Sequence, residues 1–403
     1  MKILFLSDNF YPEVNAPATR TYEHCKEWVK NGVDVTVITG APNFPKGKVF
    51  EGYKNSLYKQ EIIDGIKVIR VWTYIAENKG TIKRILDFIS FAVSAFIVGL
   101  FQKCDLIIGT TPQFFTALSA RKLSKWKRKP WVMEVRDIWP ESIKAVGAIK
   151  NQRILRYFEK KEIQCYNSAD KIIAVSKGIK ARICNKGIPE NKLAVYTNAS
   201  NLEHFTPRSP SKEFCDKYDL EGKKVIAYLG TMGMAHKLDF ILQSAKKIDD
   251  PNIMIIIIGE GAEKENLKKI KDELGLMNVM ILDGISKEQV PEFLSLIDIA
   301  LVNLKRTDLF LDVIPSKIFE NAAMGKPILL GLQGETKDII EKYKAGLAFI
   351  PEDENDFLEK LELLAKNEEV YTQCVEGCYK LAKDYNRKKI AGDMLETISS
   401  LKD

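Results

Sequence analysis

The segment at 312–327, DVIPSKIFENAAMGKP, combines residues that could bind an anion beside a pair of hydroxyls. Pro315 suits the first position of a helix, so Ser316 and Lys317 would supply amide donors and a positive charge at a helix N-terminus. Glu320 follows one turn later, and its carboxylate could accept hydrogen bonds from a vicinal diol such as ribose. The alternative is an ordinary capped helix with a solvated Glu320.

A second candidate segment, LGTMGMAHK at 229–237, places glycines at the end of an apolar run. Gly230 and Gly233 would form a strand-to-helix turn, with His236 and Lys237 where the helix starts. Backbone amides at such a turn, together with an ammonium, suit a diphosphate. A similar tight turn at 259–261, Gly-Glu-Gly, would either approach the same ligand or only end its strand.

Two loops in the first half carry further candidates. The loop after the first strand, SDNFYPEVNAPATRTYEH, lacks G-x-G-x-x-G, which argues against a dinucleotide site and a hydride-transfer enzyme. Asn15 and its small neighbours leave room for a ligand near the next helix. After the apolar run at 130–135, Arg136, Asp137 and Trp139 stand together. These residues could act on a ligand, or Arg136 and Asp137 could pair internally while Trp139 packs.

The chain supplies two sets of apolar strands to position these loops. Strands without polar alternation are typical of parallel sheets covered on both faces, and ligands bind at their carboxyl ends. In the first half the runs lie at 2–6, 33–38, 66–72, 105–109, 130–135, 170–176 and 192–198. In the second half they lie at 223–230, 252–261, 279–284, 298–304, 327–331 and 346–350.

The predicted fold class is therefore α/β, with two Rossmann-like doubly wound domains, a cleft between them and a C-terminal helical cover. Turn-rich sequence near residue 205 marks the junction. We expect an N-terminal domain over 1–204 and a C-terminal domain over 205–385. A final helix over 386–403 could pack back on the N-terminal domain.

The amino-acid composition fits two domains of this length and excludes some classes of function. The 403 residues are 45% hydrophobic and 29% charged, which fits two globular domains. A net charge of +7 is too small for a dedicated nucleic-acid binder. Seven scattered cysteines without a secretory leader indicate a reduced, cytoplasmic setting. Cys374 and Cys378 lie one turn apart without further zinc ligands, so they are interpreted as packed thiols.

One apolar segment, ILDFISFAVSAFIVGLF at 85–101, raises the question of a membrane. It could be a core or interface helix, a helix on the bilayer surface, or a short span. The run RKLSKWKRK at 121–129 follows it, with six basic residues in nine and a tryptophan. That run is either a solvated helix end or a patch facing anionic lipid headgroups.

The motifs in this order resemble glycosyltransferase family 4 enzymes of the GT-B fold over essentially the whole chain. The segments that carry the resemblance are NFYPEVNAPATRTYEH, NKGTIKRILDFISF, VRDIWPESI, KIIAVSKGI, TNASNLEHF, YLGTMG and VIPSKIFENAAMGKPI. They are most similar to bacterial transferases that build O-antigen, lipopolysaccharide or capsule repeat units, in particular the N-acetyl-L-fucosamine transferase type. The resemblance implies a UDP-sugar donor site mainly in the C-terminal domain and an acceptor site in the N-terminal domain.

Carried over residue by residue, the resemblance places two family carboxylates at Asp312 and Glu320, where the first Glu has become Asp. The Arg and Lys that grip the diphosphate map onto Thr231 and Lys237, so only the lysine remains. Lys317 could supply the missing charge. The donor site would thus contain Glu320, Lys237, Lys317, Ser316, Thr231 and Gly233, together with Asn15 from the first domain.

The catalytic candidates are Asp137, Arg136 and Asp312. Asp137 could orient or deprotonate the acceptor hydroxyl in place of the histidine that many relatives carry there. Amide donors and lysines would stabilise the departing diphosphate without a metal, and the chain has no D-x-D triplet. The resemblance implies a retaining, metal-independent enzyme without a cofactor.

These inferences lead to one leading hypothesis and two alternatives. The leading hypothesis is sugar transfer from a UDP-sugar to a polyprenyl-diphosphate-linked saccharide, by a cytoplasmic protein peripheral to the inner face of the plasma membrane and without a nucleic-acid partner. The alternatives are a nucleotide-sugar epimerase of the same fold and a non-catalytic UDP-sugar-binding homologue, with Thr231 and Asp312 as its lesions.

Overall fold

The computed structural model describes residues 1–44, 47–75, 81–141, 151–210 and 212–402, and it divides into two compact units. Unit 1 is Met1–Thr197 with Arg387–Asp403, and unit 2 is Asn198–Asn386. The chain passes from unit 1 to unit 2 after Thr197, which is earlier than the expected domain boundary after residue 204. It returns to unit 1 at Arg387, one residue after the expected start of the final helix at 386. Two of the family-like segments extend into residues 78–80 and 142–143, which lie outside the described part.

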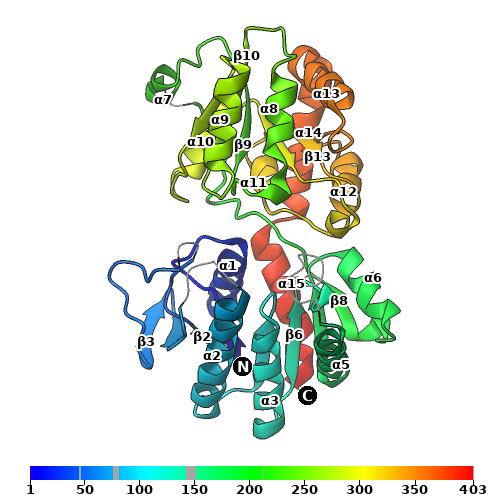
Figure 1. The fold of residues 1–403 in the computed structure, drawn as a ribbon. Coiled ribbons are helices and arrows are strands. Elements are labelled where there is room, and N and C mark those ends of the chain that lie inside the picture. Colours follow the sequence, from blue (N-terminus) through cyan, green and yellow to red (C-terminus); the bar gives the residue numbers. More distant parts are fainter. Residues whose placement is uncertain (45–46, 76–80, 142–150, 211, 403) are drawn as a thin grey trace. The chain divides into compact units, whose positions relative to one another are not determined.

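Unit 1 is built on one eight-stranded sheet among the described residues, with the order β3-β4-β2-β1-β5-β6-β7-β8 (Figure 1). Every neighbouring pair is parallel except β3 with β4. The strands are β1 (Lys2–Leu6), β2 (Asp34–Thr39), β3 (Tyr58–Ile63), β4 (Ile66–Val71), β5 (Leu106–Thr110), β6 (Trp131–Val135), β7 (Lys171–Ala174) and β8 (Leu193–Val195).

The antiparallel edge strand β3 is absent from the predicted strands. Its outward positions alternate with half-buried ones, which is typical of an exposed edge rather than of a covered strand. The signal for it was Asp64-Gly65, because both residues have positive φ (48° and 80°) as a two-residue hairpin turn requires. The sheet of unit 1 is therefore parallel except at this edge, where the sequence analysis missed an antiparallel strand.

Helices cover the sheet of unit 1. They are α1 (Ala16–Lys30), α2 (Thr81–Leu100), α3 (Phe114–Lys127), α5 (Gln152–Ser168), α6 (Lys177–Asn185) and α15 (Arg387–Ser399). The last helix returns to unit 1, where Ala391 O accepts a 2.8 Å hydrogen bond from Trp28 Nε1 and Arg387 Nε lies 3.0 Å from Glu23 Oε2. No helix in the described residues is long and apolar enough to cross a membrane.

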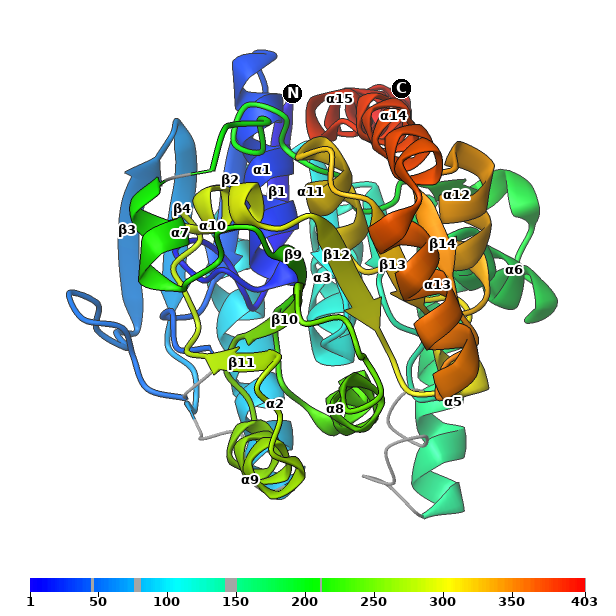
Figure 2. The ribbon, with the colours of Figure 1, turned by 90° about the horizontal axis from the view of Figure 1, so that it is seen from above.

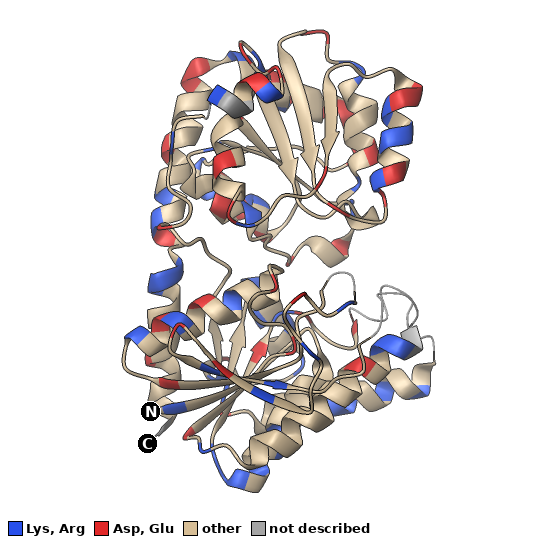
Figure 3. Ribbon diagram, turned by 90° about the vertical axis from the view of Figure 1, so that its left-hand side faces the viewer, with Lys and Arg blue, Asp and Glu red and all other residues tan. Residues whose placement is uncertain are grey.

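Unit 2 contains a six-stranded, fully parallel sheet among the described residues, with the order β11-β10-β9-β12-β13-β14 (Figure 2). Its strands carry few charged residues (Figure 3), as expected for a sheet covered on both faces. The strands are β9 (Lys224–Leu229), β10 (Ile253–Ile258), β11 (Val279–Leu282), β12 (Ile299–Asn303), β13 (Ile328–Gly331) and β14 (Gly346–Ala348). The helices are α7 (Lys212–Lys217), α8 (Leu238–Ala245), α9 (Lys264–Leu274), α10 (Val290–Leu296), α11 (Lys317–Ala323), α12 (Glu335–Tyr343), α13 (Glu354–Lys366) and α14 (Glu368–Asp384).

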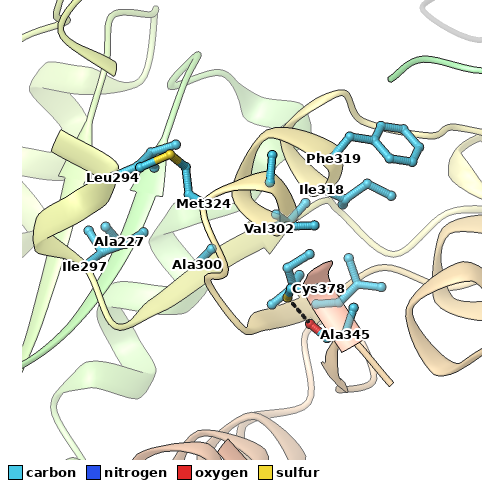
Figure 4. Close-up of a cluster of buried hydrophobic side chains, with 14 of the residues drawn as sticks. Ala227, Leu294, Ile297, Ala300, Val302, Ile318, Phe319, Met324, Ala345 and Cys378 are labelled. Carbon is cyan, nitrogen blue, oxygen red and sulfur yellow. Dashed lines mark hydrogen bonds between the residues drawn. The ribbon is translucent and has the colours of Figure 1, made fainter. Parts of the chain in front are cut away.

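Aliphatic residues from the sheet and from α10, α11 and α14 form one core of unit 2 (Figure 4). Cys378 lies in this core, where its thiol donates to the Ala345 carbonyl at 3.2 Å. Cys374 is also buried and reduced, and burial raises the pKa of both thiols. The interpretation of this pair as packed thiols is confirmed.

Each sheet has a point where the order of the strands reverses. In unit 2, β9 lies between β10 and β12, so the loops after β9 and β12 diverge to opposite faces. In unit 1 the corresponding strand is β1, between β2 and β5. A crevice for a ligand forms at such points, at the carboxyl ends of the strands. The candidate segment at 229–237 begins at the last residue of β9, and the segment at 312–327 follows β12 after residues 304–311.

Candidate functional site

The loop after β9 is held against the loop after β10 by backbone contacts that only glycine permits. Gly230 N donates to Ile258 O at 2.8 Å, and Met232 N donates to Glu260 O at 2.8 Å. A Cβ on Gly259 would penetrate the carbonyl group of Gly230, and Gly259 also has a φ of +154°. The tight turn at 259–261 therefore shapes the candidate site by supporting the loop after β9.

We expect Gly259→Ala to destabilise unit 2 by about 3 kcal/mol, because the added methyl group must displace backbone and not a flexible side chain. Thermal or urea unfolding measures this loss. Gly222→Ala is the matched control, since Gly222 also has a positive φ (+70°) but nothing within 4 Å of the added Cβ. Equal stability losses for the two variants would contradict the contact argument.

Lys317, the first residue of α11, reaches across to the loop after β9. Its Nζ lies 3.9 Å from the centroid of the Tyr228 ring, and a Cβ on Gly230 would come within 2.5 Å of that nitrogen. The side chain keeps some solvent exposure, yet enough protein surrounds the ammonium that burial lowers its pKa to about 7, against the opposing charge of Glu320. Lys317 is thus a cation held next to a glycine turn.

Glu320 lies one turn further along α11, close enough to Lys317 to influence its pKa. Ser316 directly precedes the helix, and its side chain makes no capping hydrogen bond. Asp312 is half-buried in the preceding loop, whose Ile314 carbonyl accepts a 3.1 Å hydrogen bond from Asn198 Nδ2. The structure therefore brings Lys317, Glu320 and Ser316 together at one helix end, with Asp312 just before it.

Lys237 and Gly233 line a separate depression of about 250 Å³ beside η2 (Met234–His236). Lys237 Nζ lies 2.6 Å from Asp239 Oδ2, and this contact raises the pKa of the ammonium. The predicted diphosphate ligand Lys237 is therefore already paired with a carboxylate. Thr231 is exposed, and its carbonyl accepts a 2.7 Å hydrogen bond from Tyr228 Oη.

Two further polar residues lie at this edge, and the sequence predictions missed one of them, Asn303. Asn303 is buried at the end of β12, where its Nδ2 donates to the His236 carbonyl at 2.8 Å and its Oδ1 has no partner among the described residues. His236 faces the Tyr228 ring, and burial followed by the charge of Lys317 lowers its pKa to about 4. A polar residue ending the apolar run IALVN was the available signal for Asn303.

In unit 1, Arg136 and Asp137 follow β6 beside a buried charge network. Glu134, within β6, accepts a 2.9 Å hydrogen bond from Arg20 Nε and a 2.7 Å bond from Thr110 Oγ1. Burial alone would raise the pKa of Glu134, but the charges of Arg20 and Arg136 bring it below its usual value. A carboxylate inside the apolar run WVMEV was the missed signal for this network.

Arg136 and Asp137 are close in space but differ in exposure. Burial lowers the pKa of Arg136 to about 10, and its Nη1 is buried without a hydrogen-bond partner in the described residues. Protein atoms around the Asp137 carboxyl raise its pKa, opposed by Arg136, although the side chain still reaches solvent. Arg136 is thus a cation with one buried nitrogen that lacks a hydrogen-bond partner in the described residues, and Asp137 is a carboxylate with a raised pKa.

Asn15 caps the N-terminus of helix α1 in unit 1. Its Oδ1 accepts a 2.9 Å hydrogen bond from Ala18 N as the N-cap of α1, and its Nδ2 donates to Asn9. Asp8, after β1, is half-buried, and the surrounding protein, followed by the charges of Asp87 and Glu13, raises its pKa well above the usual value. Among the described residues, no cluster of three or more His, Cys, Asp or Glu has the geometry of a metal site.

Comparison with known proteins places each half of the chain in a described family. Residues 17–204 match the Glycosyltransferase Family 4 model, and residues 211–381 match the Glycosyl transferases group 1 model. WcaI of Escherichia coli strain K12, assigned to colanic acid biosynthesis as a glycosyl transferase, is 27% identical over 84% of each chain.

Solved structures extend the likeness in fold to the whole chain. Sucrose-phosphate synthase from Thermosynechococcus elongatus superposes with a TM-score of 0.79 at 13% identity, covering 99% of this chain and 98% of that one. Anabaena Alr3699/HepE in complex with UDP-glucose superposes with a TM-score of 0.74 at 15% identity, covering 99% and 100%. The predicted fold class is confirmed. The chain belongs to the group 1 and family 4 glycosyltransferases, with the GT-B fold.

Proposed function

We propose that this glycosyltransferase moves a sugar from a UDP-sugar donor to a polyprenyl-diphosphate-linked saccharide during the synthesis of a surface polysaccharide. The proposed sugar is N-acetyl-L-fucosamine or a related N-acetylamino-dideoxy sugar. The similarity to WcaI supports the pathway class, and the fold shared with the UDP-glucose complex of HepE supports the donor class.

The observation that carries the proposal is the position of Lys317 and Glu320 on α11. The Lys317 ammonium lies against Gly230, where a diphosphate could approach the backbone closely, and Glu320 stands one turn away to accept from ribose hydroxyls. A cation and a carboxylate one helical turn apart would bind the two polar parts of a nucleoside diphosphate, its phosphates and its ribose. Lys237, engaged with Asp239, would have a smaller part than Lys317.

This arrangement explains how the donor bond could break. Cleavage of the glycosidic bond leaves negative charge on the departing phosphate, and donors positioned beforehand stabilise that charge at little reorganisation cost. Lys317 and the amides around Ser316 would supply those donors. A front-face reaction with retention is the expectation for the family, and no residue proposed here holds a metal.

On the acceptor side we assign Asp137 to orient or deprotonate the acceptor hydroxyl, with Arg136 close by. Asp137→Asn is expected to lower kcat about 10²- to 10⁴-fold, the usual contribution of a general base, with UDP affinity unchanged. The matched control is Asp34→Asn, an exposed carboxylate at the start of β2. Unchanged kcat in Asp137→Asn would remove this residue from the mechanism.

The overall proposal is tested by mass spectrometry of products. The protein is incubated with a panel of UDP-N-acetylamino-dideoxy sugars and a polyprenyl-diphosphate-linked monosaccharide, and a disaccharide mass with free UDP is the expected result. An epimerised nucleotide sugar formed without acceptor would instead support an epimerase. Absence of heat on titration with millimolar UDP would contradict the donor assignment.

A further inference from the structure

Helix α2 presents an apolar face to solvent. Beyond Arg84 its exposed positions are Leu86, Ile89, Val93 and Ile97, with 39% to 52% of each residue accessible. Spacings of three and four residues align them in one stripe along the helix. Phe101 follows directly after the helix and is 80% exposed. A surface helix normally carries polar residues along such a stripe, so this face requires an explanation.

The opposite face of α2 is fully used by the fold, so the exposed stripe is not the result of a loosely placed helix. Phe91 and Ala95 are buried, and Gly99 packs against Leu123 of α3. Figure 1 shows α2 and α3 side by side. Lys127 Nζ donates to the Leu100 carbonyl at 2.9 Å and fixes the end of α3 beside the end of α2.

Basic residues surround the stripe at both ends. Lys83 and Arg84 stand at its start, while the end of α3 and the following turn carry four exposed basic residues: Lys122, Lys125, Arg128 and Lys129. None of these four forms an ion pair with any described residue. Trp126 lies among them and is 73% exposed. Between residues 83 and 129 the chain has nine basic residues and only two acidic ones, Asp87 and Asp105.

We propose that this α2–α3 surface, the apolar stripe of α2 with the basic end of α3, docks on an anionic lipid bilayer. Apolar side chains would enter the boundary between headgroups and acyl chains, Trp126 would lie at headgroup level, and the lysines would contact lipid phosphates. A second copy of the chain is disfavoured, because two such surfaces face to face would bring like charges together.

The purpose of the docking rests on the proposed function, since a polyprenyl-linked acceptor is presented at a bilayer, but the evidence for the surface itself does not depend on that function.

Vesicle flotation tests the surface. The full chain is mixed, without donor or acceptor, with vesicles of phosphatidylcholine alone or with 30% phosphatidylglycerol, and bound protein is separated by flotation. Binding to the anionic vesicles and weak binding to the neutral ones is expected, with a decrease at high salt.

Substitutions separate the apolar from the electrostatic contribution. Ile97→Gln with Phe101→Gln should weaken anionic-vesicle binding more than tenfold, since both side chains are exposed and their loss leaves the core intact. Lys125→Gln and Lys129→Gln should each weaken it about fivefold. Leu57→Gln and Lys246→Gln, exposed positions that are not part of α2 or α3, are the matched controls and should bind as the unaltered protein does.

Several results would overturn the proposal. These are vesicle binding unaffected by the α2 and α3 substitutions, equal binding to neutral and anionic vesicles, or a dimer in light scattering that the Ile97→Gln, Phe101→Gln variant abolishes. A UDP titration of the same samples keeps the two proposals apart. Failure to bind vesicles with UDP binding intact rejects only the surface, whereas vesicle binding without UDP binding rejects only the donor assignment.

Discussion

Replacing Glu320 by Ala is expected to reduce sugar transfer at least 100-fold while unit 2 stays folded. The carboxylate is the proposed acceptor of two ribose hydroxyl hydrogen bonds, and hydrogen bonds to a charged group contribute about 1.5–3 kcal/mol each. The partly exposed side chain is not part of the hydrophobic core, so its removal creates no large cavity. Steady-state kinetics with the donor sugar and calorimetry with UDP measure the two losses.

The control for this variant is Glu376→Ala, which removes an exposed helical carboxylate on α14 and should leave kcat/KM unchanged. Thermal unfolding of both variants verifies that each is folded. Full transfer activity in Glu320→Ala would reject α11 as the donor-binding helix. Loss of activity with UDP affinity unchanged would move Glu320 from nucleotide binding to another step.

Replacing Lys317 by Met is expected to have the second large effect, with transfer falling about 10²- to 10³-fold, the usual cost of losing one preorganised donor to a developing anion. UDP affinity should fall as well. Stability should not fall, because the methionine keeps the volume and removes an ammonium that burial disfavours. A loss of activity without a loss of stability would indicate that Lys317 acts on the ligand, because replacing a merely structural lysine would lower the stability as well.

The lowered pKa of Lys317 adds a proton-linkage test to this prediction. With a pKa of about 7 the free protein holds Lys317 mostly neutral at pH 8, and a bound diphosphate favours the charged form. UDP binding at pH 8 should therefore take up close to one proton, and affinity should weaken by up to tenfold per pH unit above 7. Calorimetry in two buffers of different ionisation enthalpy measures the uptake, which should vanish in Lys317→Met.

The same pKa determines the sign of the effect on stability. The folded value lies below that of the unfolded chain, so between about pH 7 and 10.5 the unfolded state binds more protons at this site. The contribution of Lys317 to stability therefore rises with pH across this window, and Lys317→Met should lack that rise. Urea unfolding at pH 7 and pH 9 compares the two proteins, and parallel pH dependences would contradict the assignment.

The sequence alone determined every strand of the two sheets in the described residues except the edge strand β3, and it showed which loops deserved attention. Runs such as IMIIII in β10 contain no polar residue, and only a sheet covered on both faces accommodates them. The turn at 259–261 was likewise readable, because glycine acts on the local backbone. The expected helix start at Pro315 was wrong by two residues, because α11 begins at Lys317 with Ser316 as its N-cap residue. The motif at 312–327 led to the prediction of Glu320 and Lys317 as site residues, because of their charges and their spacing of one helical turn.

Only the tertiary structure decided what these segments meet. Lys317 lies against Gly230 and Tyr228 because β9 and β12 are neighbours in the sheet, an order that hydrophobic periodicity does not encode. The return of α15 to unit 1 and the burial of Asn303 also depend on contacts between distant segments. Periodicity and turn chemistry act over a few residues, whereas strand order and the burial of a charge depend on how whole elements pack together.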